Sequence, residues 1–224
     1  MIERILPPEV AAADVLGDLE DAELFPEEEA IVERAVESRR RGFATARACA
    51  RRALAELGHP PVAIGRAERR APRWPPGVVG SITHCEGYRG AAVAWAREVA
   101  TIGIDAEPNA ALGDGILERV ASRAERDRLA ELPEADPAVS WDRLLFCAKE
   151  ATYKAWFPLT RAWLGFEDAE VTIDPGAGTF TSRLLVPGPA LGASQLTGFE
   201  GRWLARDGLV ATAIALAAPL ASRR

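Results

Sequence analysis

The order of helix-forming and strand-forming segments constrains the fold more than any other feature of this sequence. Apolar residues recur with helical spacing over residues 39–57 and again over 140–157. Between and after these segments, short alternating runs separated by glycine-rich or proline-rich turns predict antiparallel hairpins. No strand–helix–strand repeat connects them, which argues against a doubly wound parallel sheet. The sequence therefore predicts an α+β protein.

Both long helices have recognisable ends. The helix over 39–57 should stop at Gly58, which is soon followed by two prolines. In the helix over 140–157, Ser140 is expected to cap the first turn, because its hydroxyl can accept a free backbone N–H. Pro158 is expected to end this helix.

Alternating segments account for most of the remaining chain. The Asp207-Gly208 dipeptide is typical of the tight turn in a two-stranded hairpin. The expected strands are 81–84, 90–96, 99–107, 171–174, 180–186, 199–205 and 209–217, and a short helix is expected over 122–131.

Charge and composition exclude several classes of protein. The 224 residues carry a net charge of −6 and are 48% hydrophobic, which is unlike a disordered chain or a nucleic-acid-binding protein.

The longest apolar run, 209–220, is shorter than the roughly 20 residues needed to span a bilayer. The N-terminus lacks the pattern of a signal peptide. Cys49, Cys85 and Cys147 have no metal-ligand spacing. We therefore expect a soluble, cytoplasmic protein with three reduced thiols and no membrane segment.

The distribution of the basic residues singles out one short segment. Of the 27 lysines and arginines, only Lys149 and Lys154 are lysines, and they flank Glu150 within a predicted helix. An exposed Glu150–Lys154 pair at this spacing would contribute only about 0.3–0.5 kcal/mol to stability. However, the neighbouring positions Phe146 and Trp156 are apolar, so this face is not typical of a solvated surface. Two cations and an acid beside aromatic rings would suit an anionic ligand with an organic portion.

Two carboxylates lie close together on a predicted strand. Asp105 and Glu107 are two residues apart in the alternating segment 99–107, so both side chains should project from the same face. Neighbouring carboxylates repel one another, and a hard cation such as Mg²⁺ would relieve this repulsion. Two solvated acids at a strand end are the simpler interpretation of this pair taken alone.

A third polar segment precedes these carboxylates in the sequence. Ser81, Thr83 and His84 bring two hydroxyls and one imidazole to the end of a predicted strand, a combination that can donate to a phosphate. His59 lies in a proline-rich loop and has no such neighbours. A structural role is the simpler interpretation of His84 on its own.

Together, these segments resemble the 4′-phosphopantetheinyl transferases of the surfactin-synthetase-activating type, in their high-GC bacterial branch. The family motif G-[IV]-D-x-E is matched at 103–107, K-E-[SA]-x-x-K-A at 149–155, and S-x-[ST]-H at 81–84. A longer similar stretch runs over 141–168. The similarity extends from about residue 25 to 217, and three motifs in family order make it specific.

This resemblance implies a fold and a reaction. Two similar α/β halves would be related by a pseudo-twofold axis, with the active site between them. We place the boundary near residue 103, so that 1–103 would bind the adenosine and phosphate side of coenzyme A. The half 104–224 would supply the metal ligands, the catalytic helix and the pantetheine pocket. The implied reaction transfers the 4′-phosphopantetheine arm of coenzyme A to a serine of an apo acyl or peptidyl carrier protein, releasing adenosine 3′,5′-bisphosphate.

The resemblance also implies a catalytic centre. Asp105, Glu107 and Glu150 would hold Mg²⁺, or alternatively Mn²⁺, against the pyrophosphate of coenzyme A. Lys154 would stabilise the departing bisphosphate, and Lys149 would also meet phosphate oxygens. Glu107 or Glu150 would accept the serine proton, and the sequence leaves this choice open.

The remaining coenzyme A contacts fall into two groups. The adenosine 3′-phosphate and pyrophosphate would meet Arg39, Arg47, Arg66, Ser81, Thr83 and His84. Arginine suits this task because its planar fork can bind a phosphate bidentately. The pantetheine arm would lie in an apolar slot lined by Phe146, Tyr153, Trp163 and Leu164.

One departure from the family pattern removes a basic residue that many members have. Arg70-Ala71-Pro72 stands where many members have Gly-Lys-Pro, so Arg66, Arg69 or Arg73 would replace the missing lysine. The carrier protein would dock near 161–164, where an arginine lies beside apolar residues.

Two other functions are alternatives to this interpretation. A metal-dependent nuclease also uses spaced acids, but the net negative charge and the Lys149-Glu150 order argue against one. A relative that binds carrier protein or coenzyme A without catalysis would not need every carboxylate and lysine of the motifs. We expect a monomeric enzyme that contacts neither nucleic acid nor membrane.

Overall fold

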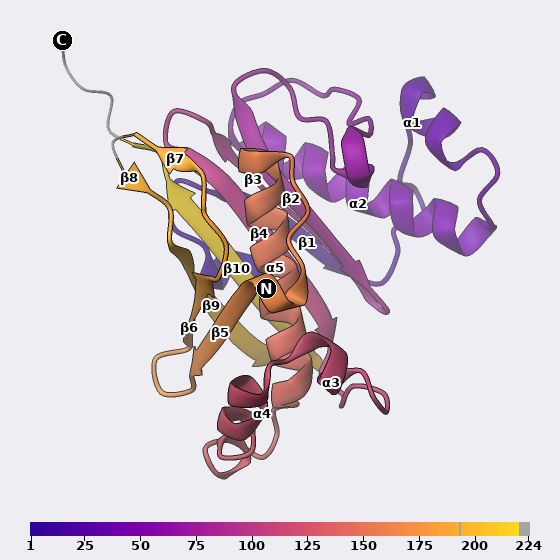
Figure 1. Cartoon of the computed structure of the whole chain (residues 1–224). Helices are drawn as coiled ribbons and strands as arrows, with labels where there is room; N and C mark the ends of the chain where they lie inside the picture. Colours follow the sequence, from indigo (N-terminus) through magenta and orange to yellow (C-terminus); the bar gives the residue numbers. More distant parts are fainter. Residues whose placement is uncertain (193, 220–224) are drawn as a thin grey trace.

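Two antiparallel sheets, each covered by one long helix, form the framework of the protein (Figure 1). The computed structural model describes residues 1–192 and 194–219; the predicted second half and the apolar run 209–220 therefore end outside the described residues. Two long helices over antiparallel sheets confirm the predicted α+β class.

The first sheet has three strands in the order β1-β3-β2. They are β1 (Ala11–Leu16), β3 (Tyr88–Trp95) and β2 (Val78–Cys85). Helix α2 (Glu37–Glu56) packs on this sheet through small residues such as Ala50 and Ala53, both of which are fully buried. The short helix α1 (Pro26–Val32) precedes α2.

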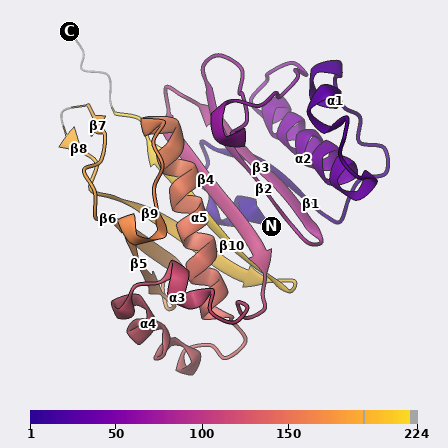
Figure 2. The same ribbon diagram turned by 45° about the vertical axis from the view of Figure 1, so that its right-hand side comes forward.

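The second sheet has five strands in the order β4-β10-β9-β6-β5. The strands are β4 (Val99–Pro108), β10 (Leu209–Ala217), β9 (Gly198–Arg206), β6 (Thr179–Leu184) and β5 (Ala169–Asp174). Helix α5 (Trp141–Thr160) lies along this sheet, and Figure 2 shows it in front of β4 and β10. The shorter elements are α3 (Leu117–Val120), α4 (Arg123–Leu129), β7 (Ala190–Leu191) and β8 (Ser194–Gln195).

Helix α5 approaches β4 closely because Gly103 has no side chain. A Cβ atom at this position would lie 2.0 Å from the carbonyl oxygen of Ala151 and 2.7 Å from the amide nitrogen of Ala155. The hydroxyl of Thr101 also donates to the carbonyl of Ala155 at 2.8 Å. The face of β4 that carries Gly103 therefore lies directly against α5. Its opposite face, with Ile102 and the other alternate apolar residues, is buried in a core between the two sheets.

Side-chain hydroxyls join the two sheets. Strands β2 and β4 run side by side in the same direction, without a backbone ladder between them. Instead, the amide of Ile104 donates to Ser81 Oγ at 3.1 Å, and the amide of Ala106 donates to Thr83 Oγ1 at 3.1 Å. Strand β4 pairs with β10 along its whole length, so the change from the first sheet to the second falls before Val99.

Two expectations about the ends of α5 were wrong. Ser140 occupies the N-cap position, but its side chain makes no capping hydrogen bond; its own amide donates to Asn109 Oδ1 at 2.8 Å. Pro158 does not end the helix, which continues to Thr160. Proline lacks only one amide hydrogen, and near a helix end this loss removes a single bond. The helix closes at Arg161, whose left-handed backbone (φ 57°) directs its amide to the carbonyl of Phe157.

Other sequence expectations concern the strands and cysteines. Strand β1 was missed, because its Ala-Ala-Ala-Asp-Val-Leu sequence has no clear apolar alternation. The three cysteines are free thiols, of which Cys49 and Cys147 are buried, as expected. Within the described part of the chain, no helix combines the length and apolar character required to cross a bilayer.

Candidate active site

A cleft lined by residues of both halves contains three adjoining pockets. The arginine pocket (250 Å³) lies beside α2, the central pocket (460 Å³) beside β2 and α5, and the apolar pocket (400 Å³) beside the C-terminal part of α5. Arg70 lines all three pockets. Glu150 and Tyr153 line both the central and the apolar pocket. The shared residues make the three pockets parts of one extended cleft.

The arginine pocket gathers four residues that the sequence assigned to phosphate binding. Arg39, Arg47, Arg66 and His84 all line it. Arg47 is buried, and its Nε donates to the carbonyl of Ile64 at 2.8 Å. Its guanidinium lies 4.2 Å from the ring centre of Phe43, and that of Arg66 lies 5.5 Å from the same ring. The ring of Phe43 therefore contacts the guanidinium groups of both Arg47 and Arg66.

Crowding of positive charge distinguishes this pocket. Burial and, to a lesser degree, the charge of Arg66 lower the pKa of Arg47 to about 10. Burial and the neighbouring Arg39 lower the pKa of Arg66. Loss of surrounding water, together with the charge of Lys154, lowers the pKa of His84. A bound anion would relieve this mutual repulsion.

Three carboxylates interact electrostatically beside the central pocket, and of the three only Glu150 lines it. Asp105 and Glu107 project from β4 toward α5, and α5 supplies the third carboxylate, Glu150. The same helix also supplies their cationic partners, Arg143 and Lys154. Burial and the charge of Asp105 raise the pKa of Glu107 and also that of Glu150. In the described part of the chain, no three His, Cys, Asp or Glu side chains are arranged to hold a metal ion.

Cationic side chains pair with two of these carboxylates. Lys154 Nζ lies 2.7 Å from Asp105 Oδ1, and Arg143 Nη1 lies 3.2 Å from Glu107 Oε2. Burial would lower the pKa of Lys154, but the charges of Asp105 and Glu150 raise it. Lys154 therefore stays a cation at the centre of the cleft.

One oxygen of Asp105 is left without a partner. Its Oδ1 atom accepts from Thr83 Oγ1 at 3.0 Å as well as from Lys154. Its Oδ2 atom is buried and has no hydrogen-bond partner among the described residues. A buried, unpaired carboxylate oxygen is costly, so this atom is a suitable ligand for a cation.

Thr83 does not face the phosphate pockets. Its side chain is fully buried, and its hydroxyl is used by Asp105 and by the amide of Ala106. In this structure the Thr83 hydroxyl is therefore engaged within the protein, and phosphate binding by Thr83 stays a prediction. Ser81 lines the central pocket, but its hydroxyl already accepts from the amide of Ile104.

The ammonium group of Lys149 is engaged within the protein. Its ammonium donates to the carbonyls of Phe166 (2.7 Å) and Ala169 (2.9 Å) and lies 3.0 Å from Glu125 Oε1. Its side chain is only 3% exposed, so all three ammonium hydrogens have acceptors within the protein. Lys149 therefore anchors α5 to the segment that lines the apolar pocket, and phosphate oxygens would have to displace these bonds.

Glu125 is a site-supporting residue that the sequence analysis missed. It is 1% exposed, and it accepts from the amides of Ser122 and Val171 as well as from Lys149. The Ser122-x-x-Glu125 spacing is a capping box, and this pattern could have marked the start of α4, with Glu125 in its first turn.

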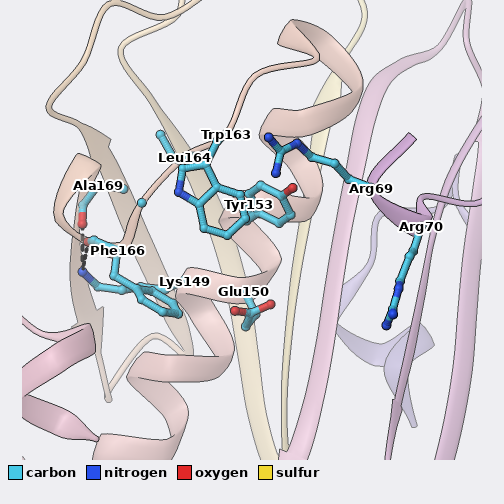
Figure 3. Close-up of a pocket in the computed structure, with 10 residues that line it drawn as sticks. Arg69, Arg70, Lys149, Glu150, Tyr153, Trp163, Leu164, Phe166 and Ala169 are labelled. Atoms are coloured by element: carbon cyan, nitrogen blue, oxygen red, sulfur yellow. Dashed lines mark hydrogen bonds between the residues drawn. The ribbon is translucent and has the colours of Figure 1, made fainter. Parts of the chain in front are cut away.

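The apolar pocket contains three of the four side chains expected to hold the pantetheine arm. Tyr153, Trp163 and Leu164 line it, together with Phe166 (Figure 3). Phe146 does not line it, but its ring centre lies 5.9 Å from that of Phe166 and supports this ring from outside the pocket.

Arg69 connects this pocket to the opposite half. Its guanidinium lies 5.4 Å from the ring centre of Trp163, whose own ring is 5.0 Å from Tyr153. Figure 3 shows Arg69 reaching toward Tyr153 from the loop of the first half. Arg69 and Arg70 both have left-handed backbones, with φ values of 51° and 65°. Two successive non-glycine residues in this conformation are uncommon and accompany functional loops.

The cleft defines a class of protein. Its cationic end suits phosphate groups, its centre suits a cation and a charged linkage, and its apolar end suits an extended organic arm. Such a cleft suits a polyphosphorylated molecule that carries a long, largely apolar substituent.

Comparisons with known proteins identify the family. Residues 27–94 match the family model of the 4′-phosphopantetheinyl transferase N-terminal domain, and residues 101–204 match that of the 4′-phosphopantetheinyl transferase superfamily. The chain is 55% identical over 222 residues to 4′-phosphopantetheinyl transferase Svp of Streptomyces mobaraensis, covering 98% of this chain and 90% of that protein. It is 56% identical to 4′-phosphopantetheinyl transferase Npt of Nocardia iowensis, covering 97% of this chain and 100% of that protein. It is 48% identical to 4′-phosphopantetheinyl transferase PptT of Mycobacterium tuberculosis, covering 96% of this chain and 98% of that protein.

The chain therefore belongs to the 4′-phosphopantetheinyl transferase family, which confirms the resemblance found in its motifs. It is an enzyme that transfers the phosphopantetheine group of coenzyme A to carrier proteins.

Proposed function

We propose that coenzyme A lies along the whole cleft while its 4′-phosphopantetheine arm is transferred to a serine of an apo acyl or peptidyl carrier protein. The continuity of the three pockets supports this placement, because Arg70 lines each of them. The 3′-phosphate would lie in the arginine pocket, near Arg39, Arg66 and His84. The pyrophosphate would lie near Lys154, and the pantetheine arm beside Tyr153.

We propose that these carboxylates bind a hard divalent cation, Mg²⁺ or alternatively Mn²⁺, although in the described residues they do not yet surround a single position. Asp105 Oδ2 is buried and unpaired, and the charge of Asp105 raises the pKa values of Glu107 and Glu150. Oxygen ligands of this kind are those that Mg²⁺ prefers, usually together with phosphate oxygens and water. Asp105, Glu107 and Glu150 would hold the cation. When bound, it would neutralise negative charge on the pyrophosphate.

The chain's own residues would then perform distinct tasks. The serine oxygen of the carrier would attack the phosphorus that bears the pantetheine arm, forming a new P–O bond. The P–O bond to the other phosphate would break, and adenosine 3′,5′-bisphosphate would leave with the bridging oxygen and its electron pair. Lys154 would stabilise the charge on this leaving group, since Asp105 and Glu150 raise its pKa and keep it protonated.

Glu107 or Glu150 would accept the proton that the serine hydroxyl loses. A general base works best when its pKa is shifted toward the working pH, and burial and Asp105 raise both pKa values in this direction. Of the two, Glu107 is already paired with Arg143, whereas no such pairing ties Glu150 in the described residues.

The decisive experiment measures the product directly. An apo acyl carrier protein is incubated with this protein, coenzyme A and Mg²⁺, and its intact mass is determined. We expect the mass of one phosphopantetheine group to be added, and EDTA to prevent the addition. Coenzyme A binding without transfer to several acyl and peptidyl carriers would contradict the proposed activity and favour a binding protein. Transfer in the presence of EDTA would contradict the proposed metal site.

Partner, oligomeric state and compartment are part of the same proposal. We propose that the carrier docks near 161–164 and that the enzyme acts as a cytoplasmic monomer. Free thiols at Cys49, Cys85 and Cys147 support a reducing compartment. Light scattering in the presence and absence of coenzyme A tests the monomer, and a dimer under both conditions would contradict it.

A further inference from the structure

We propose that Thr83 is a positioning residue for the metal site: it holds Asp105 Oδ1 so that Asp105 Oδ2 faces the cation. This inference rests on the proposed metal site. It replaces the expected role of Thr83 as a phosphate ligand, and it gives the first half of the chain a direct part in arranging a carboxylate of the second half.

The hydrogen bonds of Thr83 determine the direction of its hydroxyl hydrogen. The amide of Ala106 can only donate, so the 3.1 Å contact makes Thr83 Oγ1 an acceptor there. The hydroxyl has a single hydrogen, and its other partner is Asp105 Oδ1 at 3.0 Å. Thr83 is fully buried, so water does not compete for this hydrogen. The donor is therefore directed at one oxygen of Asp105.

The two oxygens of Asp105 differ as a consequence. Oδ1 accepts from both Thr83 and Lys154, whereas Oδ2 is buried without a partner among the described residues. Lys154 also donates to the carbonyl of Ile104 at 3.0 Å, and its long stem adapts readily. Threonine is stiff because it branches at Cβ, and its backbone lies within β2. Thr83 is thus the more rigid of the two donors that orient Asp105.

The geometry of β2 separates Thr83 from the phosphate-binding surface. Successive side chains of a strand project to opposite faces. Ile82 and His84 line the arginine pocket from one face of β2, whereas Thr83 lies on the other face, toward β4. Ser81 shares this second face and borders the central pocket, but Thr83 lines none of the three cleft pockets. A phosphate in the cleft could reach Thr83 only if its bonds to Asp105 and Ala106 were broken.

The test separates metal binding from coenzyme A binding. Mn²⁺ binding to the protein saturated with coenzyme A is measured by electron paramagnetic resonance, and the signal from coenzyme A alone is subtracted. Thr83→Val keeps the shape of the side chain but removes the hydroxyl. We expect Mn²⁺ to bind this variant 10- to 100-fold more weakly, as is typical when a group supporting a metal ligand is lost. Thr83→Ser should restore binding to near the parent value.

A second measurement addresses the phosphate-ligand alternative. Coenzyme A binding is measured by calorimetry in EDTA, where we expect Thr83→Val to match the parent. Thr45→Val is the matched control, because Thr45 is also fully buried and its hydroxyl accepts a backbone amide, that of Leu19 at 3.0 Å. This control should lose a similar amount of stability and keep its Mn²⁺ affinity. Thr83→Ala provides the same comparison if the valine variant does not fold.

The possible outcomes distinguish a failure of the role proposed for Thr83 from a failure of the proposed metal site. Unchanged Mn²⁺ affinity of Thr83→Val, or weaker coenzyme A binding in EDTA, would overturn the role of Thr83 and leave the metal site intact. If the parent protein binds no more Mn²⁺ than coenzyme A alone does, the proposed metal site fails, and the role of Thr83 with it.

Discussion

Lys154 and Asp105 form an ion pair at the centre of the cleft, with 2.7 Å between Nζ and Oδ1. The residue expected to contact phosphate thus already contacts the residue expected to bind the metal. Lys154 keeps its positive charge, because Asp105 and Glu150 raise its pKa. The pair also occupies one oxygen of Asp105 and leaves the other unpaired. It therefore positions a cation for the phosphates and a carboxylate oxygen for the metal at the same time.

Replacement of Glu150 by glutamine should abolish turnover. The variant keeps the size of the side chain but removes a charge that we assign to metal binding and, alternatively, to proton transfer. We expect kcat to fall at least about 100-fold, as measured by the intact mass of the carrier protein. Glu56→Gln is the control, since Glu56 is an exposed glutamate at the end of α2. A Glu150→Gln enzyme with parental kcat would exclude Glu150 from both roles.

The raised pKa values predict a pH-dependent stability in the absence of metal. Burial and the charge of Asp105 raise the pKa of Glu150 above its ordinary value of 4.5, so its charged form is disfavoured in the folded protein. Stability should therefore decrease as the pH rises through the raised pKa. In EDTA at about pH 7.5, Glu150→Gln should have a larger free energy of unfolding than the parent, and this advantage should disappear near about pH 4.

Urea denaturation at both pH values measures this difference. Addition of Mg²⁺ should then stabilise the parent more than Glu150→Gln, because the cation compensates the repulsion between carboxylates. An advantage of the variant that grows toward low pH would contradict the assigned direction of the pKa shift.

The arginine pocket should discriminate between coenzyme A and 3′-dephospho-coenzyme A. Arg39→Gln and Arg66→Gln should each lower kcat/KM for coenzyme A about tenfold, and much less for the dephospho analogue, because charge-assisted hydrogen bonds contribute about 1.5–3 kcal/mol. Arg52→Gln is the control, since Arg52 is exposed on α2 outside the pocket. Arg47 is less informative, because it also donates to the carbonyl of Ile64 and supports the fold. Equal losses for both substrates would place the 3′-phosphate elsewhere.

Local periodicity was sufficient to predict much of this site. Strand alternation placed Asp105 and Glu107 on one face, and Gly103 on the same face explains why that face lies against α5. Helical spacing placed Glu150 and Lys154 on adjoining sides of one turn, and both line the central pocket. These relationships depend on neighbours in the sequence, which is why the sequence alone could predict them.

The partners of individual polar groups depend on contacts between distant segments. Thr83 meets Asp105 only because β2 lies beside β4, and Lys149 meets Glu125 only because α4 packs near α5. The family resemblance implied phosphate contacts for both residues, since a hydroxyl and an ammonium can each donate to phosphate oxygens. Both side chains are buried, and buried donors are almost always hydrogen-bonded. Their acceptors are therefore other groups of the same chain.

The contact between Arg69 and Trp163 should contribute to coenzyme A binding. It holds the loop of the first half over the apolar pocket, so we expect Arg69→Gln and Trp163→Leu to be coupled by about 0.5–1 kcal/mol in a double-mutant cycle. This corresponds to about a two- to fivefold effect on KM for coenzyme A. The matched pair is Arg97 and Trp95, which lie 5.1 Å apart outside the cleft. Additive effects of the two cleft variants would show that the contact does not assist binding.

Charge at Arg161 should determine the affinity for the carrier protein. Arg161 is exposed at the end of α5, and carrier proteins of this class are typically acidic. Arg161→Glu should therefore raise KM for the carrier about tenfold and leave KM for coenzyme A nearly unchanged.

The left-handed backbone of Arg161 (φ 57°) calls for a second variant, Arg161→Gly, which removes the charge without backbone strain. Its KM for the carrier should lie between those of the parent and Arg161→Glu, and added salt should reduce all the differences, because exposed charges are screened. If glycine and glutamate raise this KM equally, the arginine acts through its packing on Phe157, 5.8 Å from the ring centre, rather than through its charge.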